Sequence, residues 1–174
     1  MLSFIQYLVE SMNSVVPHQW IRGNRAAMFD VMSLAYMVQF DYLNWTDVNA
    51  VEVVFAPTED TMRRHGIAAK RRYEIIDLKE FGLSPDQARR ATSQIFSTVT
   101  AILAEYEDRD RPDVIQFTAD EPSRRKLYIR LTTGKFQNRE YRRYVDPKLT
   151  EGVYWLVRRD IPDVLIQAAL DAAG

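Results

Sequence analysis

Residues 84–118 read SPDQARRATSQIFSTVTAILAEYEDRDRPDVIQFT, and this stretch decides the fold class. It opens with Ser-Pro-Asp, which is typical of a helix start because it supplies a side-chain cap, a fixed first turn and a charge that suits the helix dipole. Apolar residues then recur at helical spacing to about Tyr106, on a face made of Ala88, Ala91, Ile95, Val99, Ile102 and Leu103. A polar run ends the helix, and Val114–Thr118 follows as a buried strand that we expect to be parallel to an earlier one.

Upstream, the apolar period changes from that of a helix to that of a strand. Leu34–Tyr42 alternates aromatic and aliphatic residues with others, and Ala50–Ala56 is a Val-rich run stopped by Pro57. The polar segment Thr58–Ala69 is interpreted as a loop, and Arg72–Leu78 as a third strand. Short connections favour antiparallel neighbours, so these three strands are expected to form a meander.

The first thirty residues are interpreted as largely helical. Residues 2–12 carry apolar side chains at steps of three and four, which predicts an amphipathic helix. Residues 17–23 are expected to form a loop that carries His18 and Trp20, and Arg25–Val31 a second short helix.

The C-terminal third alternates helices and strands. Glu121 opens a predicted helix that Gly134 ends, and Tyr141–Val145 and Gly152–Val157 are two closing strands. Asp160 is expected to cap a final helix whose apolar face is Ile161, Val164, Leu165, Ala168 and Ala169. The whole chain, residues 1–174, is therefore predicted to be one α+β domain with a mixed, mostly antiparallel sheet of about six strands flanked by helices.

Composition excludes several classes of function. The 174 residues include no cysteine, so disulfides, thiolate metal sites and a cysteine nucleophile are excluded. The formal charge is −1, without the basic surplus of a dedicated nucleic-acid binder, although residues 120–160 hold eleven Lys and Arg against six acids. We expect no membrane span and no signal peptide, and a cytoplasmic location.

The familiar catalytic and metal motifs are missing from the sequence. His18 and His65 are the only histidines, and neither has a second His at helical spacing. Carboxylates could complete a site, but no spacing indicates one, so no metal site is predicted. The chain has no Gly-x-x-x-x-Gly-Lys loop, no Gly-x-Gly-x-x-Gly fingerprint and no Gly-x-Ser-x-Gly elbow.

The order of elements resembles the GNAT acyltransferase fold with its first strand missing. In that family the strand after the long helix runs into an Asn-x-x-Ala-x-x-Leu-Tyr helix and then a Gly-Phe pair. Here Leu127 and Tyr128 match, whereas Glu121 replaces the Asn and Arg124 the Ala. A Ser-Arg-x-Lys-Leu-Tyr wording in the same helix is also similar to small uncharacterised proteins of tailed bacteriophages.

The resemblance implies specific roles for a few residues. Tyr128 stands where a GNAT enzyme protonates the departing thiolate, and Glu52 or Glu74 where it deprotonates an amine. Acetyl-CoA would be held at the start of the long helix, on the stretch that contains Gly82, Ser84, Gln87 and Ala88. That stretch has one glycine, Pro85 lacks an N–H, and Asp86 puts negative charge where phosphate would bind, so a self-capped helix without a cofactor is expected there.

Arginine pairs and tryptophans are the candidate interaction surface. Because Trp and Arg dominate many protein interfaces, we single out ten residues: Arg63, Arg64, Arg71, Arg72, Arg124, Arg125, Arg142, Arg143, Trp20 and Trp45.

Three hypotheses of function follow. The first is a phage-type, non-catalytic GNAT-like protein that binds a host enzyme, a defence complex or a virion subunit in the host cytoplasm, with a homodimer as an open alternative. The second is an acyl-CoA-dependent N-acyltransferase with a divergent cofactor loop. The third is a nucleic-acid-binding protein that uses the basic residues 120–160.

Overall fold

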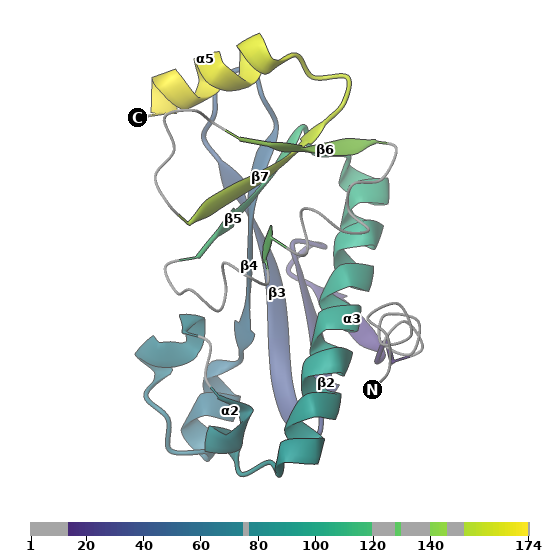
Figure 1. Cartoon of the computed structure of the whole chain (residues 1–174), viewed down its shortest axis with the longest axis vertical. Helices are drawn as coiled ribbons and strands as arrows, with labels where there is room; N and C mark the ends of the chain where they lie inside the picture. The colour runs from purple at the N-terminus through teal and green to yellow at the C-terminus, as the bar shows by residue number, and fades with distance from the viewer. Residues whose placement is uncertain (1–13, 75–76, 120–127, 130–139, 146–151, 174) are drawn as a thin grey trace. The chain divides into compact units, whose positions relative to one another are not determined.

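The structure is a computed structural model that describes residues 14–74, 77–119, 128–129, 140–145 and 152–173 (Figure 1). The chain divides into two compact units. Unit 1 comprises Met1–Gln39 and Phe55–Arg109, and unit 2 comprises Phe40–Val54 and Asp110–Gly174. Within the described residues, no helix has both the length and the apolar composition needed to cross a bilayer.

Seven strands are found in the described residues: β1 His18–Ile21, β2 Ala26–Val31, β3 Leu34–Leu43, β4 Ala50–Pro57, β5 Val114–Thr118, β6 Tyr141–Tyr144 and β7 Val153–Arg158. The helices are α2 Glu59–Arg64, α3 Pro85–Asp110 and α5 Asp163–Ala173, with two short 3₁₀ helices, η1 Ala69–Tyr73 and η2 Leu78–Phe81. The strands form one sheet in the order β1-β2-β3-β4-β5-β7-β6. The predicted α+β class and the mostly antiparallel, mixed sheet are confirmed.

The parallel strand predicted after the long helix is present. β5 pairs with β4 in parallel, with Ala50 opposite Val114 and Glu52 opposite Gln116. β5 also pairs with β7, which in turn pairs with β6, and both of these pairs are antiparallel. This crossover fits a strand that returns to the sheet through a long helix.

In unit 1, β1 and β2 form a hairpin where a loop and a short helix were expected. β1 pairs antiparallel with β2, with His18 opposite Phe29, and β2 pairs antiparallel with β3. Phe29 stacks on Tyr36 of β3, with 5.7 Å between the ring centroids. The predictions were wrong because sheet pairing and aromatic packing outweigh the weak helix preference of an Ala-Ala-Met start.

The segment after β4 is also helical where a loop and a strand were predicted. Thr58 begins α2, since its Oγ1 accepts a hydrogen bond from Thr61 N–H at 3.3 Å. Thr61 is buried, and its Oγ1 accepts a hydrogen bond from Ala35 N–H at 3.0 Å, which ties α2 to β3. Arg72 and Tyr73 lie in η1 and not in a strand. The missed signal at 58–60 is a capping Thr followed by two acids.

α3 begins at Pro85 as predicted but ends at Asp110, later than the expected end near Tyr106. Its predicted apolar face is largely confirmed, with Ala91, Val99, Ile102 and Leu103 buried. In Figure 1 the helix runs alongside β2. The chain before β1 is tied to it, because Val16 N–H donates to Thr98 Oγ1 at 3.0 Å.

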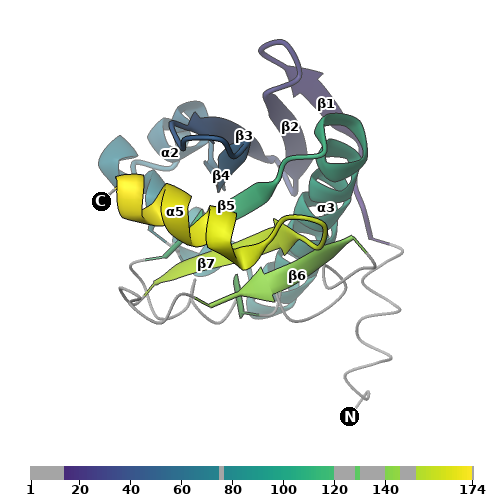
Figure 2. The ribbon, with the colours of Figure 1, turned by 90° about the horizontal axis from the view of Figure 1, so that it is seen from above.

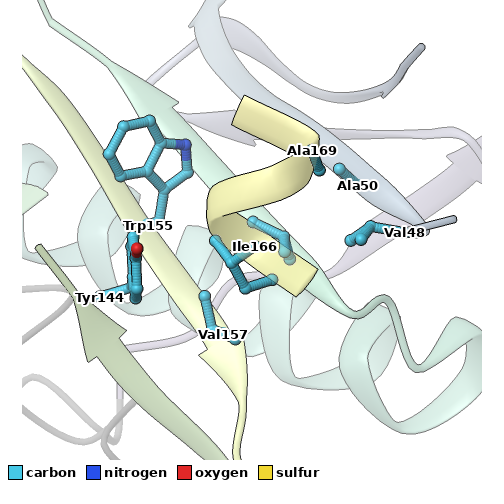
Figure 3. Packing of buried hydrophobic residues seen from close by; sticks show 8 residues of the cluster. Val48, Ala50, Tyr144, Trp155, Val157, Ile166 and Ala169 are labelled. Carbon is cyan, nitrogen blue, oxygen red and sulfur yellow. The ribbon is translucent and has the colours of Figure 1, made fainter. Parts of the chain in front are cut away.

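In unit 2, α5 covers part of the sheet with a face that agrees with the predicted one only at Ile161 and Ala169 (Figures 2 and 3). It begins at Asp163, so Asp160 does not cap it. Ile166 and Ala169 are the buried residues, whereas Val164 is 72% and Leu165 43% exposed. Their buried cluster contains Val48, Ala50, Val114, Tyr144, Trp155, Val157, Ile166 and Ala169. Ile166 and Ala169 lie three residues apart and share the side of the helix that packs on this cluster, whereas Val164 and Leu165 lie off it.

The predicted helices at residues 2–12 and in most of 121–134 lie outside the described residues. Of the second, Tyr128 and Ile129 are described and are helical. The closing strands β6 and β7 agree with the prediction to within one residue at each end.

Candidate functional site

One face of β4, β5 and β7 in unit 2 is covered by α5 over only part of its length. Ala50, Val114 and Val157 lie under the helix, in the cluster of Figure 3. Further along the same face, side chains alternate in step with Ala50 and Val114, which brings Glu52, Gln116 and Thr118 to this side of the sheet. The face thus has an apolar half under α5 and a polar half beside it.

Hydrogen bonds link the polar half into a row that crosses three strands. Trp155 Nε1–H donates to Gln116 Oε1 at 2.9 Å, and Gln116 Nε2–H to Thr118 Oγ1 at 3.4 Å. The Thr118 hydroxyl donates in turn to Glu52 Oε1 at 2.6 Å. We call Trp155, Gln116, Thr118 and Glu52 the polar row. Every donor in it points toward Glu52, so the row ends in a carboxylate.

The carboxylate of Glu52 is accessible and has little compensation from the protein. Glu52 and Gln116 are half-buried, and Thr118 is exposed. Within the described part of the chain, the Thr118 hydroxyl is the only hydrogen-bond donor to Glu52, and no cationic side chain forms an ion pair with it.

Tyr128, the other candidate catalytic residue in unit 2, lies on the opposite side of β5. It is 1% exposed, and its ring lies 5.2 Å from that of Phe117 and 6.4 Å from that of Tyr154, centroid to centroid. Alternation along β5 puts Phe117 and Gln116 on opposite faces. Tyr128 therefore packs in the core, on the face away from the polar row.

Glu74 is not mid-strand as predicted. It lies just after η1 in unit 1, exposed, and accepts a hydrogen bond from Arg71 Nε at 2.8 Å. The same Arg71 also pairs with Glu80 at 3.0 Å. Glu74 is thus part of a surface ion-pair network with Arg71 and Glu80, and not a carboxylate in a cleft.

The start of α3 is closed by its own side chains. Gln87 N–H donates to Ser84 Oγ at 3.3 Å, and Ser84 N–H donates to Gln87 Oε1 at 2.9 Å. This reciprocal pair is a capping box, so the helix end is self-capped as predicted. Gly82, another predicted cofactor residue, ends η2 with a φ of +79°. Ala88 N–H donates to Ser84 O at 2.8 Å, an ordinary helical bond.

The arginines of unit 1 that were predicted to form an interaction surface are paired with acids. Arg63 and Arg64 both contact Asp60, and Arg72 contacts Glu59 at 2.9 Å. The hydrogen bond from Arg63 lowers the pKa of Asp60. These pairs, with those of Arg71 above, neutralise most of the local positive charge.

The arginines of unit 2 differ among themselves. Arg142 pairs with Asp163, and its guanidinium lies 5.9 Å from the ring centroid of Tyr144. Arg143 lies 5.9 Å from the Tyr154 ring centroid. Arg124 and Arg125 lie outside the described residues. Trp45 packs edge-to-face on Trp155 at 6.5 Å, against the cluster under α5.

A second polar cluster, which sequence reasoning missed, surrounds Glu105 of α3 in unit 1. His18 Nε2 lies 3.0 Å from Glu105 Oε2, and Trp20 Nε1–H donates to the same oxygen at 2.9 Å. The Arg109 guanidinium stacks 4.2 Å from the centroid of the Trp20 ring and donates to Asn24 O at 2.7 Å. We call His18, Trp20, Glu105 and Arg109 the Glu105 cluster. The i, i+4 spacing of Glu105 and Arg109 can be seen in the sequence. Their partners His18 and Trp20 could not be predicted, because β1, which carries them, was expected to be a loop.

The Glu105 cluster changes the acidity of its carboxyl. Burial raises the pKa of Glu105, but the hydrogen bonds from Trp20 and His18, together with the charges of His18 and Arg109, outweigh it and bring the pKa below the ordinary value. The other histidine, His65, packs edge-to-face on Phe81 with 5.2 Å between ring centroids. Among the described residues, no three His, Asp or Glu side chains are grouped as metal ligands are.

Comparison of the chain with family models, with curated proteins and with solved structures found no match in any of the three.

Proposed function

We propose that this chain is a non-catalytic domain with a GNAT-like arrangement of strands that acts by binding a protein partner. The observation that carries the proposal is the capping box at the start of α3. Ser84 and Gln87 satisfy each other's backbone N–H groups there, at 3.3 and 2.9 Å. Pro85 has no N–H to offer, and Asp86 adds negative charge. The position at which the resemblance would put a pyrophosphate already holds the protein's own groups.

Unit 2 supplies the features expected of a binding surface. Val164 and Leu165 expose apolar side chains on α5, and the accessible carboxylate of Glu52 lies on the sheet face that α5 partly covers. Exposed apolar groups beside a few accessible polar ones are typical of interfaces. The likeness to tailed-phage proteins makes a host enzyme, a defence complex or a virion subunit the partner classes to test.

Site-specific photo-crosslinking tests the proposal. A photoreactive phenylalanine analogue at Val164, which is 72% exposed, is expected to crosslink one discrete protein in cells. The matched control carries the analogue at Arg89 of α3, whose side chain is 80% exposed. Unlabelled wild-type protein should compete for the crosslink at 164. Absence of a competed product, or the same product from position 89, would contradict partner binding at this surface.

An N-acyltransferase is a second candidate, favoured by one specific observation. Glu52 on β4 and Tyr128 beyond β5 belong to the same unit, and β4 and β5 are the parallel pair. This reading expects acetyl-CoA to bind and both Tyr128→Phe and Glu52→Gln to lower turnover without unfolding the domain. Burial of the Tyr128 ring on the face away from Glu52 weighs against it.

Nucleic-acid binding receives less support. The described arginines Arg63, Arg64 and Arg142 are engaged by Asp60 and Asp163. Phosphate binding would have to displace these acids, and the formal charge of −1 offers little long-range attraction. Steep salt dependence of binding to a DNA or RNA oligonucleotide would restore this reading.

A further inference from the structure

We infer that Glu52 is a recognition residue for the ammonium group of a lysine side chain that a protein partner presents to the polar row. The inference rests on the proposed partner-binding function and names the chemistry of that partner. It starts from the direction of the hydrogen bonds. Trp155 donates to Gln116, Gln116 donates to Thr118, and Thr118 donates to Glu52. The last residue of the row is therefore a carboxylate that can accept further hydrogen bonds.

The carboxylate of Glu52 has no cationic partner among the described residues. In the described residues its one donor is the Thr118 hydroxyl at 2.6 Å, and no Lys, Arg or His forms an ion pair with it. Several other acids have such a partner: Asp60, Glu59, Glu80 and Asp163 each pair with an arginine. The half-buried carboxylate of Glu52 lacks one among the described residues, so it is available to a cation that a partner supplies.

The hydrogen bonding of the two oxygens of Glu52 favours one kind of cation. Oε1 already accepts a hydrogen bond from Thr118, so a ligand that uses both oxygens would have to share Oε1, whereas Oε2 accepts no hydrogen bond from the described residues. A guanidinium binds carboxylate best as a two-pronged fork that uses both oxygens, whereas an ammonium is a compact point charge satisfied by one. The geometry therefore favours lysine over arginine.

The surroundings of the row hold it in place. Trp155 is 5% exposed and packs in the cluster under α5, with its indole N–H fixed on Gln116 at 2.9 Å. Glu52 and Gln116 are opposite each other in the parallel pair of β4 and β5. Because these residues lie on paired strands, little conformational entropy is lost when a ligand binds. The buried indole also reports on events at the other end of the row.

The test is an NMR titration that follows the three tryptophan indole N–H signals of the ¹⁵N-labelled protein. The probe is Nα-acetyl-lysine N-methylamide, and its neutral control is the norleucine analogue, with salt matched throughout. A single ionic contact supports only weak binding, so the probe is taken to roughly 0.1 M. We expect a saturable shift of the Trp155 signal with the lysine probe, none with norleucine, and a weaker response to the arginine analogue.

Variants separate recognition from folding. Glu52→Gln keeps the shape and the acceptor for Thr118 and should weaken lysine binding roughly ten- to a hundredfold. Glu105→Gln, in unit 1, should leave it unchanged. No lysine-dependent shift, an equal shift with norleucine, tighter binding of the arginine analogue, or unchanged binding by a folded Glu52→Gln protein would each overturn the inference.

The crosslinking experiment at position 164 distinguishes a failure of lysine recognition from a failure of the proposed partner binding. A competed crosslink that survives Glu52→Gln overturns lysine recognition and leaves partner binding standing. Lysine binding without any competed crosslink contradicts the proposed partner-binding surface instead.

Discussion

The two units each contain a glutamate reached by a tryptophan indole, and the two carboxylates are used differently. In the Glu105 cluster, Trp20 and His18 both contact Glu105 Oε2, at 2.9 and 3.0 Å, and Arg109 lies one helical turn away. In the polar row, Trp155 reaches Glu52 only through Gln116 and Thr118. The carboxylate of Glu105 joins β1 to α3 within the protein. The carboxylate of Glu52 can still accept hydrogen bonds from a ligand. The comparison teaches that the surroundings of a carboxylate, and not its residue type, separate a structural role from a binding role.

The largest expected effect separates the two tryptophans. Trp155→Ala should lower the free energy of unfolding by about 3–5 kcal/mol, because it empties the cluster under α5. Trp20→Ala, on the edge strand β1, should cost only about 1–2 kcal/mol, from the lost hydrogen bond and the lost stacking with Arg109. Urea unfolding followed by circular dichroism measures both. Equal losses of unfolding free energy in the two variants would mean that the polar row is no better packed than the Glu105 cluster.

A smaller effect is expected at the start of α3 in unit 1. Ser84→Ala removes half of the capping box and should cost about 1 kcal/mol. Thr92→Ala is the control on the same helix, because Thr92 is exposed and its hydroxyl donates to Ala88 O within the helix, so its change should stay within about 0.5 kcal/mol. If the two variants lose the same free energy of unfolding, Ser84 is not a structural cap. The backbone N–H of Gln87, which it accepts from, would then be available to a ligand.

Acidification should affect Glu105 next. Its pKa in the folded protein is below the ordinary value of 4.5, so its contribution is present above that pH and is lost as the pH falls through the lower, folded value. Because half of the side chain is exposed to solvent, the contribution is under about 1 kcal/mol. The stability difference between wild type and Glu105→Gln should be largest at neutral pH and disappear below the folded pKa. A difference that is constant with pH would contradict the role assigned to the Trp20 and His18 contacts.

The smallest expected effect on stability is at Glu52. Glu52→Gln should change the free energy of unfolding by less than about 0.5 kcal/mol, since it retains the Thr118 contact and removes an uncompensated charge. The measurement is the same urea titration at neutral pH. A loss larger than that of Glu105→Gln would reverse the comparison and make Glu52 a structural residue.

The sequence predicts well the elements whose pattern is strong locally. The Ser-Pro-Asp start of α3, the alternation of β3 and the parallel β5 are all confirmed. β1, β2 and α2 were missed, since β1 and β2 depend on pairing with β3 and α2 on burial of Thr61 against Ala35. Local preference is a weak guide where partners far along the chain decide.

The candidate site was predictable only in part. Glu52 was singled out, and alternation correctly puts it on an accessible face. Its partners Thr118 and Gln116 were not, because they are brought to it by the register of β4 and β5, which no local pattern encodes. Glu74 was misplaced because Arg72 and Tyr73, which begin the strand predicted around it, lie in the 3₁₀ helix η1, and Glu74 follows that helix and pairs with Arg71.

A thermal-shift titration with acetyl-CoA and CoA, with adenosine diphosphate as the control ligand, tests the central claim most directly. A ligand at about a hundred times its dissociation constant stabilises a fold by roughly 2.7 kcal/mol, which is a shift of a few degrees for a domain of this size. We expect no saturable shift in Tm with any of the three ligands, because the capping box closes the start of α3. A saturable rise in Tm with acetyl-CoA and CoA but not with adenosine diphosphate would contradict it and make the N-acyltransferase reading the better one.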